Sequence, residues 1–142
     1  MKPYLIRQFD IFNDYHAVIA LWYSCAPNIQ LRESDSLSEI AKLYESNPQL
    51  LLVAECDGRI VGTLFGAFDG RRGMMYHLAV AEDYRRQGIA NELICIFEEH
   101  LRALGCIRYY LLVVEDNQQA INFYVNRGFE FLTVKTLAKN LI

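Results

Sequence analysis

The chain has 142 residues, of which 53% are hydrophobic and 22% are charged, and its formal net charge at pH 7 is −3. High apolar content with little net charge excludes an intrinsically disordered chain, and the length predicts a single domain over residues 1–142. The longest apolar run, residues 17–23, is much shorter than the roughly 20 residues of a membrane span. The slightly acidic charge argues against a broad nucleic-acid-binding surface, so we expect neither a membrane nor a nucleic acid as partner.

The first half of the chain predicts helices and an antiparallel meander. A strand is expected over Tyr4–Phe9, and Asp10 can cap a helix that ends near Cys25. A polar loop over Ala26–Ser36 precedes a short helix over Leu37–Glu45. Three strands joined by glycine-containing turns then follow, over Leu50–Glu55, Ile60–Phe68 and Met74–Val80.

The second half favours helices that alternate with strands. Apolar residues from Ile89 to Leu104 recur at helical spacing, and Gly105 is placed to end this helix. Residues Ile107–Val114 are apolar on both faces, which predicts a central strand covered by helices. The rest of the chain predicts one helix and two strands, over 117–127, Phe129–Leu132 and Val134–Lys139. The expected fold is α/β, a mixed α+β sheet of about six to seven mostly antiparallel strands flanked by about four helices.

The segment with the clearest chemical signal follows the strand that ends at Val80. After a polar turn it reads Arg85-Arg86-Gln87-Gly88-Ile89-Ala90, so a helix begins at a glycine beside two arginines. The N–H groups of a first helical turn attract anions, and a glycine lets a phosphate approach the backbone. The segment therefore predicts a phosphate or pyrophosphate site. The alternative is an ordinary strand-to-helix loop with solvated charges, and neither standard glycine-rich nucleotide motif is present.

Four cysteines lie at positions 25, 56, 95 and 106, without a Cys-x-x-Cys pair or a histidine at metal-ligand spacing. The amino terminus lacks the apolar core of a signal peptide. The economical interpretation is a cytoplasmic protein with reduced thiols and no metal.

The loop from Arg85 to Ala90 matches the pattern Arg/Gln-x-x-Gly-x-Gly/Ala. A second motif follows at the start of a later helix and consists of Asn117, Ala120, Phe123, Tyr124 and Gly128-Phe129. In this order the two motifs resemble those of the GNAT superfamily of N-acetyltransferases, and the resemblance covers essentially the whole chain. It looks closest to the small bacterial YpeA-like branch. The chain departs from the usual pattern at Glu82, where a proline is often found, and at Ala90, where the last glycine often stands.

The resemblance implies acetyl-CoA as co-substrate and no metal. Backbone groups at the end of the strand, at Leu78, Ala79 and Val80, would bind the pantetheine arm. The pyrophosphate would be held by the loop residues Arg85, Arg86, Gln87, Gly88, Ile89 and Ala90. On the later helix, Asn117 would contact the pantetheine or stabilise the site, with Ala120 and Phe123 beside the cofactor. Tyr124 would protonate or hydrogen-bond the leaving thiolate.

The resemblance further implies an N-acetyltransferase that moves an acetyl group from acetyl-CoA to a primary amine by direct attack. An alkylammonium with a pKa near 10.4 needs about 4–5 kcal/mol to lose its proton at pH 7. Tyr76 acting through a water, Glu55 and His77 are candidates for the base, although a structural role is the favoured interpretation of His77 on its buried strand. Leu112 stands where ribosomal-alanine acetyltransferases carry a glutamate, which argues against that specificity.

Two other functions remain open at this level. One is a catalytically weak sensor or interaction module that binds CoA or acetyl-CoA. The other uses Cys56 or Cys106 to hydrolyse the thioester, although neither cysteine has a base next to it in the sequence. The acceptor amine belongs to a small molecule, a peptide or a protein. Dimers are common among similar proteins, so a homodimer is one option, and the loop Ala26–Ser36 either borders the acceptor site or is a polar surface connection.

Overall fold

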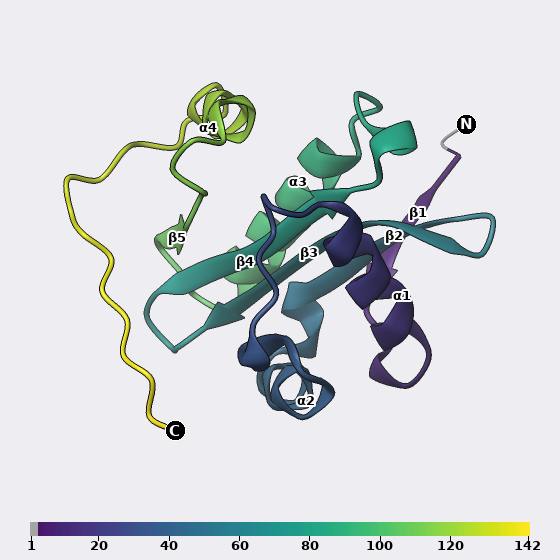
Figure 1. Cartoon of the computed structure of the whole chain (residues 1–142), viewed down its shortest axis with the longest axis horizontal. Helices are drawn as coiled ribbons and strands as arrows, with labels where there is room; N and C mark the ends of the chain where they lie inside the picture. Colours follow the sequence, from purple (N-terminus) through teal and green to yellow (C-terminus); the bar gives the residue numbers. More distant parts are fainter. Residues whose placement is uncertain (1–2) are drawn as a thin grey trace. The chain divides into compact units, whose positions relative to one another are not determined.

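A computed structural model of the chain describes residues 3–142 (Figure 1). These residues form two compact units, one that ends at Leu112 and one over Val113–Ile142. The single domain expected over residues 1–142 stays a prediction.

A five-stranded sheet is the framework of the first unit, and its strands are ordered as in the chain. They are β1 (Leu5–Gln8), β2 (Leu51–Cys56), β3 (Arg59–Phe68), β4 (Gly73–Val80) and β5 (Tyr109–Leu111). The first four pair antiparallel, whereas β5 pairs parallel to β4. The mixed, mostly antiparallel sheet is thus confirmed, but the predicted count of six to seven strands is wrong.

The error in the strand count lies at the end of the chain. In the structure, residues 129–142 contain no helix and no strand, so the strands predicted over Phe129–Leu132 and Val134–Lys139 are absent from this described segment. Their apolar residues alternate, but a strand forms only where a neighbouring edge accepts its N–H and C=O groups. The strand predicted over Ile107–Val114 is shortened to β5. It is not a buried central strand, because β5 is at the edge of the sheet and its three residues are only half-buried.

Four α-helices are present in the described residues: α1 (Ile11–Ser24), α2 (Leu37–Ser46), α3 (Ile89–Ala103) and α4 (Gln118–Val125). The carboxylate of Asp10 accepts the amide of Phe12 and caps α1, and the Ser36 hydroxyl accepts the amide of Glu39 and caps α2. Gly105 has φ +90° and follows α3, as its position in the sequence predicts.

Alternate residues of β3 contact helices on opposite faces of the sheet. On one face, Thr63 accepts a buried hydrogen bond of 2.9 Å from the indole of Trp22 in α1. On the other face, an added Cβ at Gly62 would lie 3.0 Å from Ile89 in α3. Helices α1 and α2 therefore cover one face and α3 the other (Figure 1). This arrangement places the start of α3 beside the end of β4, where the sequence predicts the anion site.

We expect Gly66→Ala to destabilise the fold by roughly 1–3 kcal/mol, because its Cβ would lie 2.3 Å from the ring of Phe97 and 2.7 Å from the backbone oxygen of Met74. Gly62→Ala is the matched control on the same face of β3. Its nearest neighbour is a side-chain methyl at 3.0 Å, which can move, so the loss should be smaller. Urea unfolding of both variants measures the difference. Equal losses of unfolding free energy in the two variants would show that the close contact between α3 and Gly66 does not stabilise the fold.

Candidate functional site

The loop between β4 and α3 has an unusual backbone. After a 3₁₀ turn over Glu82–Tyr84, Arg86 has φ +63° and Gly88 has φ +86°. No side chain caps α3, and its helical bonding begins where the amide of Glu92 donates to the oxygen of Gly88 at 3.0 Å. The amides of Ile89 and Ala90 consequently have no acceptor within the helix. Such a turn can bind an anion through backbone N–H groups.

The two arginines of the loop differ in their surroundings. Arg85 donates from Nε to the backbone oxygen of Val80 at 2.9 Å, and its Nη2 lies 3.9 Å from the sulfur of Cys25. Arg86 is exposed. Arg85 therefore supports the end of β4, whereas Arg86 is available to a ligand in solution.

Much of β4 extends beyond its pairing with β5. Only Gly73, Met74 and Met75 pair with β5. The amide of Ala81 donates to Val61 in β3, so by strand alternation the backbone of Ala79 also faces β3, while Leu78 and Val80 face the opposite edge. Of the three predicted pantetheine residues, Leu78 and Val80 thus present backbone groups to the outer edge of β4, and Ala79 does not.

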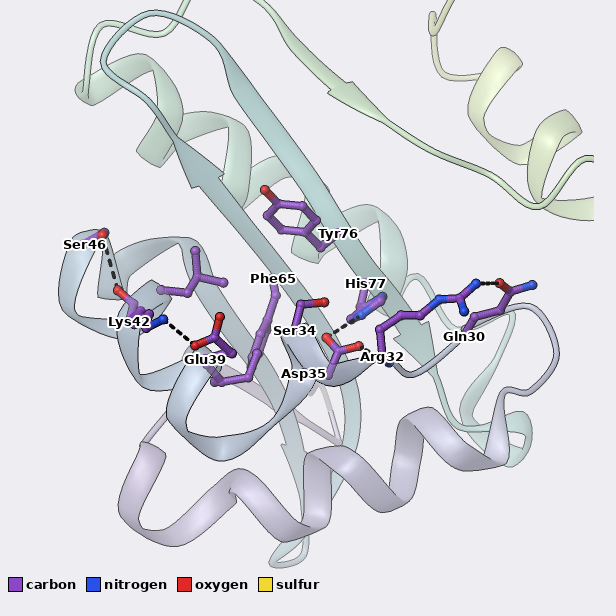
Figure 2. A pocket seen from close by; sticks show the side chains of 12 residues that line it. Gln30, Arg32, Ser34, Asp35, Glu39, Lys42, Ser46, Phe65, Tyr76 and His77 are labelled. Atoms are coloured by element: carbon purple, nitrogen blue, oxygen red, sulfur yellow. Dashed lines mark hydrogen bonds and ion pairs between the residues drawn. The ribbon is translucent and has the colours of Figure 1, made fainter. Parts of the chain in front are cut away.

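A β-bulge in β4 places two consecutive side chains on one face. Phe65 pairs with His77 and Gly66 pairs with Met75, which leaves Tyr76 without a partner residue in β3. Tyr76 and His77 both line a cavity of about 460 Å³ with Phe65, and Figure 2 shows their side chains together with those of the surrounding loop and helix. Asp35 and Glu39 supply its acidic groups.

Asp35 and His77 form a hydrogen bond in the wall of this cavity. The Asp35 Oδ1 lies 3.0 Å from His77 Nε2, and the two side chains are 11% and 17% exposed. Burial by itself raises the pKa of Asp35, but hydrogen bonds from His77 and from the amide of Arg32 outweigh it, and the pKa lies below the ordinary value. Asp35 belongs to the loop Ala26–Ser36, but its contact with His77 was not predicted, because no local pattern marks a contact between residues 42 positions apart.

The second unit holds the other predicted motif. Asn117 caps α4 by accepting the amide of Ala120 at 3.2 Å. The ring of Tyr124 lies 5.3 Å, between centroids, from each of the rings of Phe123 and Phe129. Burial raises the pKa of Tyr124 to about 12, so this phenol stays protonated throughout the physiological range. The predicted residues thus fall into two groups, one along β4 and the start of α3 and one on α4.

Between residues 3 and 142, no helix is both long enough and apolar enough to span a bilayer. No group of three or more histidine, cysteine, aspartate or glutamate side chains in these residues is arranged to hold a metal ion.

Comparison with known proteins gives a consistent result. The model of the acetyltransferase (GNAT) family matches residues 15–129. An acetyltransferase of Pectobacterium atrosepticum is 41% identical over 130 residues, which are 92% of this chain and 91% of that protein. Ard1 from Thermoplasma volcanium has the same fold, with a TM-score of 0.80 at 24% identity, over 93% of this chain and 86% of that one.

PaiA N-acetyltransferase from Thermoplasma acidophilum, solved with coenzyme A, has a TM-score of 0.78 at 20% identity, over 95% of this chain and 94% of that one. The chain belongs to the GNAT family and is an acetyl-CoA-dependent acetyltransferase. The YpeA-like branch, the cytoplasmic location and the homodimer stay predictions.

We expect Asp35→Asn to lower the free energy of unfolding by roughly 1–2 kcal/mol at pH 7, because it removes a charged hydrogen bond that is mostly shielded from water. The folded-state pKa of Asp35 is depressed, so its contribution is present above the ordinary carboxyl pKa of about 3.9 and is lost as the pH falls through the folded value. The difference between wild type and variant should therefore shrink as the pH falls below the ordinary carboxyl value and vanish below the folded one.

Denaturant unfolding between pH 2 and 8 measures this dependence. Asp57→Asn is the control, since Asp57 lies exposed in the β2–β3 turn and asparagine tolerates its φ of +49°. A pH-independent difference for Asp35→Asn would contradict the role of the carboxylate charge.

Proposed function

We propose that the chain is an N-acetyltransferase that moves the acetyl group of acetyl-CoA to a primary amine by direct attack on the thioester. The observation that carries the proposal is the position of the uncapped start of α3, which follows directly on the outer edge of β4. The two features match two polar parts of CoA. The pyrophosphate needs N–H donors, and the amides of the pantetheine arm need the backbone groups of a strand edge as hydrogen-bond partners.

In this proposal the pyrophosphate binds the amides from Arg86 to Ala90, and the side chains of Arg86 and Gln87 add donors. The left-handed backbone at Arg86 and Gly88 orients consecutive N–H groups toward one point. The pantetheine extends along β4 and bonds Leu78 and Val80. Arg85 acts indirectly, because its hydrogen bond to Val80 fixes the strand end.

The acceptor amine enters the cavity beside the bulge, where Tyr76 contacts it. Its nitrogen attacks the carbonyl carbon of the thioester, the C–S bond breaks, and no acyl-enzyme forms. Tyr124 donates a hydrogen bond to the sulfur. With the phenol pKa raised to about 12 and a thiol pKa near 8.5, complete proton transfer is uphill by about 5 kcal/mol, so a hydrogen bond is the favoured form of assistance.

Residues on α4 support this contact. Asn117 fixes the first turn of the helix through its cap. Ala120 and Phe123 are spaced by one helical turn, so they share a face of α4, and in the proposal this face lies beside the pantetheine. The PaiA N-acetyltransferase solved with coenzyme A supports CoA as the ligand of this fold.

Acetyl-CoA should raise the melting temperature, whereas ATP and NAD at equal concentration should not. At about 100 times the dissociation constant the stabilisation is about 2.7 kcal/mol, which is a shift of several degrees. Arg86→Ala should weaken acetyl-CoA binding about tenfold, since it removes a charge-assisted donor. Arg71→Ala, in the exposed β3–β4 turn, is the matched control and should bind as wild type. No shift in the wild-type protein would overturn the cofactor site.

Tyr124→Phe should lower kcat about 100-fold while the thermal shift with acetyl-CoA persists, because only the hydrogen bond to the leaving sulfur is lost. Tyr23→Phe, on the exposed end of α1, is the control. Release of free CoA thiol with a panel of amines measures turnover. Binding without turnover in the wild type and in both variants would instead support a CoA-binding sensor.

A further inference from the structure

The wall of the cavity contains an imidazole held in a fixed orientation. The Trp22 ring lies 4.5 Å, between centroids, from the His77 ring, and the Trp22 indole is itself anchored to Thr63. Asp35 Oδ1 contacts His77 Nε2 at 3.0 Å. The carboxylate of Asp35 is fixed in turn, because it also accepts the amide of Arg32 at 3.1 Å. The plane of the imidazole and its rotation are therefore both set by well-shielded partners.

These contacts determine which imidazole nitrogen is free. An ionised carboxylate can only accept, so Nε2 carries the hydrogen in neutral His77 and the lone pair is on Nδ1. Nδ1 has no hydrogen-bond partner among residues 3–142. Every buried side-chain nitrogen or oxygen of these residues has a hydrogen-bond partner. Because Nδ1 has none, it is not buried and is accessible to solvent. His77 also lines the cavity.

We propose that His77 is the general base that takes the proton from the acceptor ammonium, and that Asp35 is its positioning residue. This inference rests on the proposed N-acetyltransferase function. His77 is next in the chain to Leu78, whose backbone faces the edge assigned to the pantetheine. The base therefore lies beside the part of acetyl-CoA that carries the acetyl group. A structural clamp between Asp35 and β4 requires only Nε2, whereas a base requires the accessible Nδ1 as well.

The proton balance of the step is complete. The ammonium N–H bond breaks, its proton passes to Nδ1, and the nitrogen keeps the electron pair. That pair forms the C–N bond to the acetyl carbon, and the C–S bond breaks with its electrons on sulfur. The thiolate takes up the second proton that the nitrogen loses as it becomes an amide, and imidazolium returns its proton to solvent through the cavity.

His77 suits this task better than Tyr76. Phenols with an ordinary pKa of about 10 are ionised in only about one molecule in a thousand at pH 7, whereas imidazoles with an ordinary pKa of about 6.5 are mostly neutral. Several other groups face the pair and set its pH response. They are Arg32 beside Asp35, Tyr15 of α1, which donates to the Asp35 backbone oxygen, and the ion pair of Glu39 with Lys42 on α2.

The test compares two small acceptors of similar shape. Benzylamine is an ammonium at pH 7 and needs a base before it attacks, whereas aniline is neutral. His77→Gln should lower kcat/KM for benzylamine about 100-fold and for aniline less than about fivefold. A merely structural role would lower both alike, which would overturn the proposal. His100→Gln is the matched control, because His100 is a partly buried histidine on α3 that contacts the backbone oxygen of Gln49.

The pH profile of kcat with benzylamine tests the pair. The acid limb caused by imidazole protonation should be present in wild type and His100→Gln and absent in His77→Gln. Asp35→Asn should lower kcat for benzylamine more than for aniline, because the imidazole loses the acceptor that fixes its tautomer. An unchanged limb in His77→Gln would assign the base to another group.

One further measurement needs no acceptor. Long-range ¹H–¹⁵N NMR of the full chain above pH 8, with His77→Gln for assignment, should show the Nε2–H tautomer for His77. The Nδ1–H tautomer would overturn the proposal even if the wild type acetylates neither probe. The thermal shift with acetyl-CoA separates failure of the proposed function from failure of this inference. If wild type shows none, the proposed function fails, whereas a shift retained in His77→Gln with unchanged kinetics refutes this inference alone.

Discussion

The bulge at Tyr76 is the constraint on which the site of the first unit depends. A regular β4 would direct Tyr76 and His77 to opposite faces of the sheet. With one residue left unpaired in β4, both side chains line the same cavity. Pairing with β5 also ends at Met75, immediately before the bulge, so the following backbone is free of that strand. The bulge therefore directs Tyr76 and His77 into the cavity at the point where the outer edge of β4 becomes free of β5.

The close approach of α3 to the sheet has a comparable effect on the anion site. Gly62 and Gly66 leave room on β3 for Ile89 and Phe97, so the helix lies directly on the strand. Its start is thereby fixed a few residues after Val80, and Arg59 holds the intervening turn through Asp83 at 3.0 Å. The amides of the first turn are preorganised before any ligand arrives, which lowers the entropy that binding must overcome.

The features that the sequence predicted are those with local causes. The cap at Asp10 and the glycine-led start of α3 depend on residues within a few positions of one another. The bulge and the Asp35–His77 pair depend on register and on contacts between distant segments, and no local pattern encodes them. The strands predicted after Gly128 are absent from the described residues because a sequence pattern reports what a segment can form, and not whether that segment pairs with an edge in the folded chain.

The chemistry of the two halves of the reaction explains why the donor is easier to infer than the acceptor. The proposed CoA contacts are made mainly by backbone groups, at Leu78, Val80 and the first turn of α3. Backbone groups are the same for every sequence that keeps the fold, so a fold shared at 20% identity can retain them. The cavity is lined by side chains, and each substitution there changes its shape or charge. In the proposed function, specificity for the amine therefore depends on residues such as Asp35, Tyr76 and His77, which neither the fold nor the loop motif determines.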